Sequence, residues 1–195
     1  MICRLRPEFR KLLISTTAMV LIATTSCGQG SVNVAPPPSK DWRTAPATSR
    51  EALSARPLRL LKLSRGTRCP RTTAADTQYG MAAGLRPIRA VITPDSNPGV
   101  LGTGLRDGRY FGKVLWVIDG QYSGLVLVRG ARVDGTGDLM FGDAPPLSTE
   151  LTMSAKGSSA VDTGMPSTVS VSQPGCYEFQ VDAATFTSFI VFEVT

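Results

Sequence analysis

The sequence predicts an all-β protein: an antiparallel β-sandwich of immunoglobulin-like architecture that follows an N-terminal signal helix and a disordered tether. Three observations lead to this prediction. Short apolar or alternating segments recur along residues 56–195, and Gly, Pro and Asp-Gly turns separate them. No helical periodicity lasts for three turns after the first 26 residues. Each segment can bury one face well, so two sheets must close on each other.

The first 26 residues have the layout of a bacterial export signal. Four cations, Arg4, Arg6, Arg10 and Lys11, precede an uncharged apolar run from residue 12 to residue 23. This run is shorter than the ~20 residues that a membrane-spanning helix needs. Small residues follow it, as a signal peptidase requires. We therefore predict a signal peptide over residues 1–26 and an extracytoplasmic location for the rest of the chain.

Cys27 directly follows these small residues and leads to a second prediction. Residues 23–28, ATTSCG, resemble the lipobox of bacterial lipoproteins, with Ser26 before the cysteine and Gly28 after it. Thr24 departs from that pattern, because leucine is usual at its position. We predict that Cys27 is the lipid-attachment residue and that the mature chain is anchored to the cell membrane through it. Ordinary cleavage, which would leave a secreted protein, is the alternative.

A Pro-rich stretch separates Cys27 from the strand-forming region. Residues 27–55 contain Pro36-Pro37-Pro38 and are otherwise mostly small and polar. Proline lacks an amide donor and has a fixed backbone angle, so such a stretch favours extended, solvated conformations. We predict a flexible tether over residues 27–55 and a single β-sandwich domain over residues 56–195.

The expected strands differ in how their residues alternate. Residues 57–63, PLRLLKL, alternate leucine with basic residues for most of their length, as a half-buried strand does. Residues 113–118, KVLWVI, are continuously apolar after the lysine, which favours a central strand covered on both faces. Residues 97–108 are rich in Gly and Pro and predict a loop. The other expected strands cover residues 88–93, 124–133, 138–141, 150–153, 168–171, 176–181 and 188–194.

The four cysteines predict one disulfide. Cys3 would leave with the signal peptide, and Cys27 would carry the lipid. Cys69 and Cys176 remain as an even pair in an oxidising compartment, where thiols are expected to pair. In the chain-entropy model a bridge that closes a loop of this length contributes about 4–5 kcal/mol. The alternative is a reactive or metal-binding thiol pair, but the chain has neither a CxxC spacing nor a histidine to support it.

The absence of histidine weighs against catalysis. No Ser-His-Asp or Cys-His pair can form, and no lysine follows a serine at the SxxK spacing. Asp119, Asp134, Asp138 and Asp143 lie at turns and could offer oxygen ligands to calcium. The sequence DGTGD over residues 134–138 does not match an EF-hand loop, however, and Asp-Gly is ordinary turn chemistry. We predict no catalytic residue, no metal site and no cofactor.

The charge of the chain is modest once the signal is set aside. The formal net charge is +6, and the first 26 residues hold four cations and one acid, so residues 27–195 carry +3. Such a balance is no footprint of nucleic-acid binding. We interpret a cluster of seven cations early in the mature chain as a solvated strand face and linker, with contact to anionic lipid or wall polymer as the alternative. These cations are Arg50, Arg56, Arg59, Lys62, Arg65, Arg68 and Arg71.

Two stretches resemble a recurring, uncharacterised β-sandwich domain of exported bacterial proteins and lipoproteins. Lys113–Gly142, KVLWVIDGQYSGLVLVRGARVDGTGDLMFG, is similar to the "KVLWV-D-Y-G-VLVRG-LDG" middle of that domain, and Pro166–Val194 to its "PGCY-QVDG-FS-VIVF" end. Residues 56–70, RPLRLLKLSRGTRCP, also fit, with Cys69 at the matching cysteine. The resemblance implies a β-sandwich with a paired disulfide, and it implies no activity.

Together these observations predict an exported, lipid-anchored cell-envelope protein whose β-sandwich has a non-catalytic binding or structural role. The turn at Asp134 and the Gly/Pro-rich loop before Lys113 are the expected recognition elements. The expected partners are the membrane, through the N-terminal lipid, and an envelope protein or polysaccharide, with no nucleic acid. The alternative is a carbohydrate-active enzyme or other hydrolase with two carboxylates about 5–10 Å apart. Five aromatic residues could form a sugar-stacking face or pack in the core: Tyr110, Phe111, Trp116, Tyr122 and Tyr177.

Overall fold

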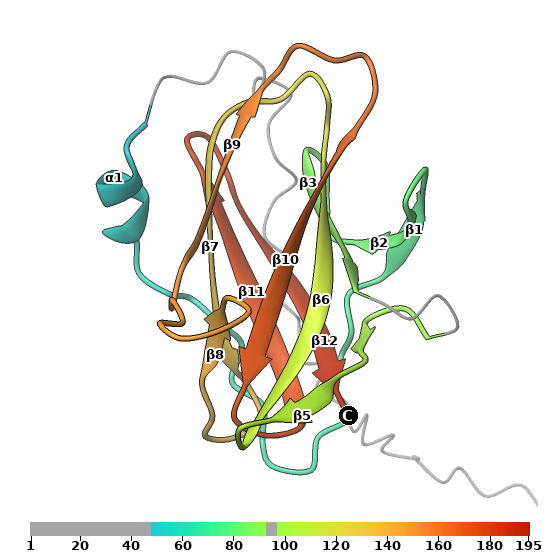
Figure 1. Ribbon diagram of the computed structural model, residues 1–195, viewed down its shortest axis with the longest axis vertical. Helices are drawn as coiled ribbons and strands as arrows, with labels where there is room; N and C mark the ends of the chain where they lie inside the picture. The colour runs from blue at the N-terminus through green and yellow to red at the C-terminus, as the bar shows by residue number, and fades with distance from the viewer. Residues whose placement is uncertain (1–47, 93–96) are drawn as a thin grey trace, which may run out of the picture. The chain divides into compact units, whose positions relative to one another are not determined.

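The computed structural model describes residues 48–92 and 97–195, which form a two-sheet β-sandwich with a short helix beside it (Figure 1). The predicted all-β sandwich is therefore confirmed. The predicted signal peptide, Cys27 and the tether as far as residue 47 lie outside the described residues. Among the residues that are described, no helix combines the length and the apolar character that crossing a membrane requires.

The first sheet has seven strands and is centred on β6. Since β10 pairs with residues 110–118 of β6, both β3 and β5 must lie along the other edge of that strand. All pairs in this sheet are antiparallel. In spatial order the strands are β1 (Ala74–Thr77), β2 (Gly80–Ala83), β3 (Ile88–Ile92), β6 (Arg109–Ile118), β10 (Thr163–Val171) and β8 (Leu139–Phe141), with β5 (Gly104–Arg106) beside one end of β6.

The second sheet has five strands and contains one parallel pair. Its order is β4 (Val100–Leu101), β12 (Thr187–Val194), β11 (Gly175–Ala183), β7 (Ser123–Arg132) and β9 (Leu151–Lys156). The predicted antiparallel arrangement is wrong at β4, which runs parallel to β12. This short strand buries both of its residues at the edge of β12, and Glu193 donates its amide to the Gly99 carbonyl (2.8 Å).

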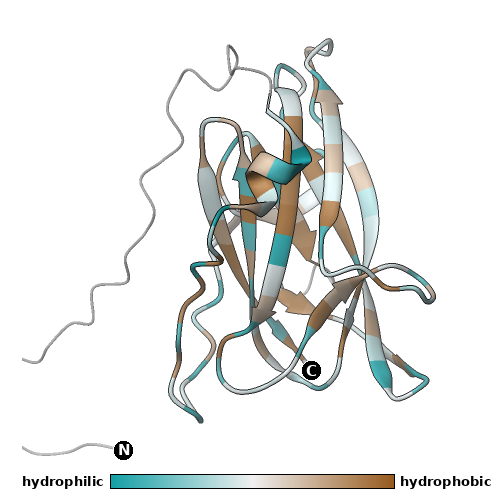
Figure 2. Cartoon of the chain, turned by 90° about the vertical axis from the view of Figure 1, so that its left-hand side faces the viewer, coloured by the Kyte–Doolittle hydropathy of each residue, from teal (hydrophilic) through white to brown (hydrophobic). Residues whose placement is uncertain are grey.

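Apolar side chains from both sheets fill the space between them. The Trp116 ring of β6 meets the Phe179 ring of β11 with centroids 5.2 Å apart, and Phe179 stacks on Phe192 of β12 at 4.4 Å. All three side chains are fully buried. Figure 2 shows apolar and polar residues alternating along the strands, as expected when one face of each sheet packs on the core.

The expected strands from residue 88 onward all have a counterpart in the structure, and several are longer than predicted. Strands β1 and β2 were not predicted, because their Ala- and Gly-rich segments have low β-propensity. In the structure β2 pairs with β3, and β1 pairs with β2. The predicted loop over residues 97–108 is wrong in part, since β4 and β5 lie within it.

The tether prediction is wrong at its C-terminal end. Helix α1 (Arg50–Ser54) lies inside the predicted tether, and the Ser49 side chain caps it by accepting a hydrogen bond from the Ala52 amide (3.2 Å). Leu53 is fully buried, and Arg129 of β7 donates to the Ser54 carbonyl (3.2 Å). The packed part of the chain therefore begins by Arg50 rather than at residue 56.

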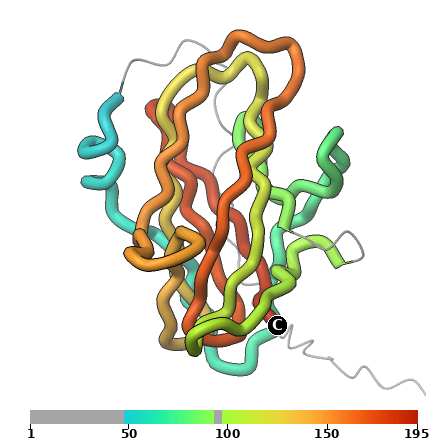
Figure 3. Tube along the Cα trace, viewed as in Figure 1, coloured from blue at the N-terminus to red at the C-terminus, as the bar shows by residue number. Residues whose placement is uncertain are grey.

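The predicted strand at residues 57–63 is also wrong. These residues are extended but belong to neither sheet. They form part of a segment, residues 56–72, that we call the strap. In Figure 3 the strap, in blue-green, leads from α1, passes behind the sandwich in that view, turns at its lower end and rises to β1.

Candidate functional site

The strap crosses the outer face of the second sheet and bonds to side chains there. The Arg59 amide donates to Oε1 of Gln180 (2.7 Å), and the Leu61 amide donates to Oε2 of Glu178 (2.6 Å). In return, Nε2 of Gln180 donates to the Pro57 carbonyl (3.1 Å). The alternation in residues 57–63 predicted a half-buried segment, and Leu60, Leu61 and Leu63 are half-buried. These leucines pack on the face of a sheet and not along its edge, which is why no strand forms.

Polar contacts also hold both ends of the strap. At the first end, the Arg56 guanidinium donates to the carbonyls of Ala183 (2.7 Å) and Ala184 (3.1 Å) at the end of β11. At the second end, the Thr72 amide donates to the Val191 carbonyl (3.0 Å), and the Val191 amide donates to Oγ1 of Thr72 (2.8 Å). The strap is thus fixed at the sheet before and after its exposed middle.

The predicted disulfide between Cys69 and Cys176 is present in the structure and joins the strap to the beginning of β11. Their Cα atoms are 5.4 Å apart, within the limit of about 7 Å for a bridge. The buried Cys176 packs in a small apolar cluster outside the main core. This cluster also contains Val133 and Val191 from the sheet side and Leu60, Leu61, Leu63 and Cys69 from the strap.

The strap covers a row of polar side chains on β11. Glu178, Gln180 and Asp182 alternate with core residues along this strand, and each is at most 2% exposed. Burial raises the pKa of Glu178, against the opposing effect of the Leu61 amide. Asp182 pairs with Arg129 of β7 at 2.7 Å. Sequence reasoning missed this buried row, because an alternating polar residue on a strand is the usual sign of a face in water.

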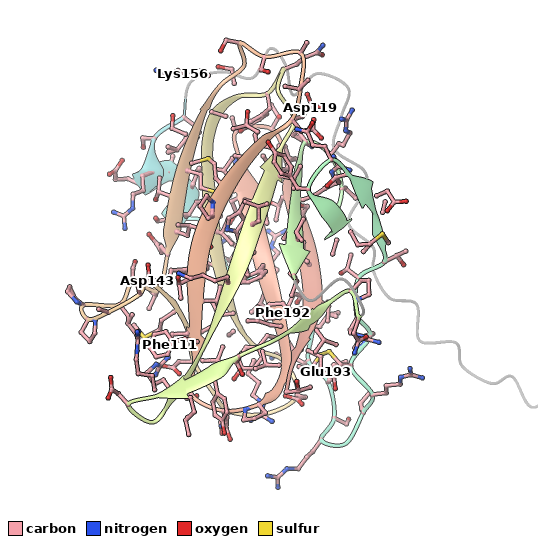
Figure 4. The ribbon with its side chains drawn as sticks, turned by 45° about the vertical axis from the view of Figure 1, so that its right-hand side comes forward. Phe111, Asp119, Asp143, Lys156, Phe192 and Glu193 are labelled. Carbon is pink, nitrogen blue, oxygen red and sulfur yellow. A yellow bond between two sulfur atoms is a disulfide. The ribbon has the colours of Figure 1, made fainter. Side chains whose placement is uncertain are left out.

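The outward side of the strap is cationic. Its exposed middle contains a turn in which the Thr67 amide donates to the Ser64 carbonyl (3.0 Å), and Gly66 supplies the positive φ of +82° that this turn requires. In Figure 4 the strap's loop, at the lower end of the ribbon, carries long nitrogen-tipped side chains that point away from the sandwich.

The structure divides the seven clustered cations into two groups. Three have partners: Arg50 pairs with Glu150 (2.7 Å), Arg56 caps the end of β11, and Arg71 donates to the Asn97 side chain (2.7 Å). The other four are exposed, and their side chains enter none of the ion pairs or hydrogen bonds among the described residues. These four are Arg59, Lys62, Arg65 and Arg68.

A shallow pocket of about 450 Å³ lies between the strap and the turn after β7. The strap lines it with leucines and Lys62, and the turn lines it with Arg132, Val133 and Gly135. Arg132 pairs with Asp134 at 2.6 Å and donates to the Thr136 carbonyl (3.2 Å). These contacts hold the turn at Asp134, a predicted recognition element, against the end of β7. Burial raises the pKa of Asp134, but hydrogen bonds from the Arg132 side chain and the Cys176 backbone, together with the Arg132 charge, outweigh it and lower that pKa overall.

Each aspartate considered as a calcium ligand pairs with a different cation. Asp119 pairs with Arg86 (3.3 Å), and Asp143 pairs with Lys113 (2.6 Å). Figure 4 shows Asp119 near the upper end of the sandwich and Asp143 on its side. Asp138 pairs with Arg109 at 3.0 Å, and Asp134 pairs with Arg132 at 2.6 Å. The described part of the chain contains no group of three or more His, Cys, Asp or Glu residues that could hold a metal ion.

Two carboxylates do share a partner. Arg86 lies 3.3 Å from Asp119 and 3.1 Å from Asp162, and Arg89 approaches Asp162 at 2.6 Å. This network joins the start of β3 to the turns that follow β6 and precede β10. Both carboxylates are mostly buried, and guanidinium groups neutralise them.

The five aromatic residues do not form one face. Trp116, Tyr122 and Tyr177 are buried in the core. Tyr110 and Phe111 are half-buried, and the Arg106 guanidinium lies 4.1 Å from the centre of the Phe111 ring. Of the two possibilities that the sequence left open, Trp116, Tyr122 and Tyr177 take core packing, and the five residues do not assemble a sugar-stacking face.

Comparison with known proteins gives one distant structural likeness. The sequence matches no protein-family model, and no curated protein is significantly similar to it. Among solved structures, the fold is similar to a protein described as a candidate lipoprotein from Bacillus anthracis, with a TM-score of 0.43 and 14% identity over 67% of this chain and 88% of that chain. Similarity at this level assigns neither a family nor a function.

Proposed function

We propose that this is an exported, lipid-anchored cell-envelope protein whose β-sandwich has a non-catalytic binding or structural role. The export and anchoring part rests on residues 1–27, with their cationic start, short apolar run and lipobox-like end. The non-catalytic part rests on the state of the carboxyl groups in the described domain.

The single observation that carries the non-catalytic role is that seven carboxylates are engaged in ion pairs. Arginine or lysine partners favour the ionised form, and the pKa values of Asp138 and Asp143 are both lowered. For Asp143 the Lys113 hydrogen bond is the main cause; for Asp138 burial opposes the shift, but Arg109 and Ser172 outweigh it. A general acid needs the opposite shift.

Glu178 is the described carboxyl group whose pKa shifts upward, and its position argues against an acid role. It lies under the strap and accepts a hydrogen bond from the Leu61 amide. A general acid must reach the leaving group of a substrate within hydrogen-bond distance. Because the strap covers Glu178, this carboxyl group supports the attachment of the strap rather than a reaction.

The anchoring part is tested by Cys27→Ala in the producing cell. We expect the wild-type protein in the membrane fraction and the variant in the soluble fraction or the medium, because the variant has no thiol to acylate. Cys3→Ala is the matched control and should remain with the membranes, since this cysteine precedes the predicted cleavage site. Mass spectrometry of the mature N-terminus should find a lipid-modified Cys27; an unmodified N-terminus with unchanged fractionation of Cys27→Ala would reject the anchor.

A further inference from the structure

We propose that the outward side of the strap binds the anionic headgroups of a phospholipid bilayer. This surface, the strap face, consists of Arg59, Lys62, Arg65 and Arg68 together with the exposed Leu58. The proposal rests on the proposed envelope location and adds to it a second contact with the membrane, one that needs no covalent lipid.

The first argument is the distribution of unpartnered cations. Among the described Lys and Arg residues, ten have side chains that form an ion pair or a hydrogen bond. The side chains of five do not, and four of these five lie within ten consecutive residues of the strap. The fifth is Lys156, at the end of β9. Eight of the ten partnered cations pair with a carboxylate, and Arg71 and Arg106 bond to neutral oxygens. In the described part of the chain, unpartnered positive charge is therefore concentrated on the strap face.

The second argument is that the strap presents these charges from a fixed backbone. Gln180 and Glu178 hold the strap before the turn, and the disulfide at Cys69 holds it directly after Arg68. At the tip of the turn, a Cβ atom built on Gly66 would meet no atom within 4 Å, so this tip stands in open space. A flat charged surface can reach side chains held in this way without any rearrangement of the domain.

The third argument is the apolar surface beside the charges. Leu58 is 45% exposed, and leucines of the strap line the shallow pocket next to Lys62. Cations next to exposed leucine suit a bilayer interface, where phosphate groups and the edge of the acyl region lie within a few ångströms of each other. A soluble polyanion would pair with the cations of the strap face but would leave its leucines exposed to water.

Covalent reach also favours the bilayer as the partner. Arg59 follows Cys27 by 32 positions, and a chain extends at most about 3.6 Å per residue. With a lipid on Cys27, the strap face would remain within roughly 115 Å of the membrane. A weak surface contact then acts at a high effective concentration and can be significant even where the free domain would bind poorly.

The experiment measures binding of the mature chain, residues 27–195 carrying Cys27→Ala, to sedimented vesicles. We expect binding to vesicles of phosphatidylglycerol mixed with phosphatidylcholine, no binding to pure phosphatidylcholine, and loss of binding as salt shortens the screening length. Each cation near an anionic surface is worth about fivefold in affinity, so Arg65→Gln/Arg68→Gln should weaken binding about 25-fold.

Lys156→Gln is the matched control for Arg65→Gln. Both variants lose one exposed, unpartnered charge, and Figure 4 shows Lys156 at the opposite end of the sandwich from the strap's loop. Arg65→Gln should weaken binding about fivefold, and Lys156→Gln should leave it unchanged. Since neither side chain has a partner among the described residues, both variants should melt at the wild-type temperature.

Three results would overturn the proposal. They are no binding of the parent chain to anionic vesicles, an equal loss for Lys156→Gln and Arg65→Gln, and binding to soluble polyphosphate without binding to vesicles. The last result would point to an anionic wall polymer instead. Because the tested chain cannot carry a lipid, its vesicle binding is independent of the cell fractionation that tests Cys27.

Discussion

The two faces of β11 are both buried, but the burial has a different chemical basis on each face. On the inner face, Tyr177, Phe179 and Val181 pack in the apolar core between the sheets; on the outer face, Glu178, Gln180 and Asp182 lie under the strap. Apolar burial is non-directional and proportional to area. Buried polar groups instead require particular donors, and without them burial is costly. The inner face therefore supplies most of the stability, and the outer face determines where the strap lies.

The largest expected effect is on the inner face. Phe179→Ala should lower the free energy of unfolding by about 3–5 kcal/mol, because it removes the ring that meets both Trp116 and Phe192. Urea denaturation followed by tryptophan fluorescence measures this loss. Leu58→Ala on the strap is the control and should change stability by about 0.5 kcal/mol or less. Equal losses for the two variants would contradict the assignment of stability to the core.

The second effect concerns the attachment of the strap. Cys69→Ser/Cys176→Ser should lower the free energy of unfolding by about 2–4 kcal/mol, since the unfolded chain loses its cross-link. This range lies below the chain-entropy value of about 4–5 kcal/mol because measured disulfide contributions usually fall short of that model. It should also let the strap open locally, so that trypsin cleaves after Arg65 and Arg68 before the domain unfolds. Limited proteolysis with mass spectrometry detects these cuts. Phe179→Ala should show no such early cuts; early cleavage in both variants would mean that the strap opens only with the whole domain.

The smallest effect is a pH dependence on the outer face. Burial raises the pKa of Glu178, so its contribution to stability is fully present below the unfolded pKa and is lost as the pH rises through the folded one. Glu178→Gln keeps an acceptor for the Leu61 amide and removes the titration. We expect the stability of wild type relative to this variant to fall as the pH increases from acidic toward neutral.

Urea denaturation of both chains over this pH range provides the measurement. Asp134 and Asp138 have lowered pKa values and lose their contribution as the pH falls, but they do so equally in both chains, so the difference isolates Glu178. A difference that stays constant with pH would mean that Glu178 titrates as it does in the unfolded chain.

Much of the sandwich was predictable from the sequence because its strands carry a local signal. The run around Trp116 predicted a strand covered on both faces. In β6 Trp116 faces the core between the sheets, and Val117 on the opposite face is also buried, in a small cluster with Ala82 and Val91 of neighbouring strands in the same sheet. The bridge between Cys69 and Cys176 followed from cysteine arithmetic together with an export signal. The export signal and the lipid on Cys27 remain predictions of the sequence.

The strap face was only half predictable. The sequence placed seven cations between residues 50 and 71, but it could not separate the four that are free from the three that have partners. The partners of those three lie far along the chain: Arg50 pairs with Glu150, 100 residues away, and Arg56 bonds to Ala183, 127 residues away. Only the fold brings such residues together.

By itself, then, the sequence determined the all-β class, the strands β3 and β6 to β12 and the cysteine pair, because alternation and composition are local properties of the chain. The tertiary structure alone decided that residues 57–63 lie on the face of a sheet rather than at its edge, and that Glu178, Gln180 and Asp182 are buried. The physical reason is that periodicity reports how many sides of a segment are covered. What covers each side depends on contacts between residues more than 100 positions apart, such as those between the strap and β11.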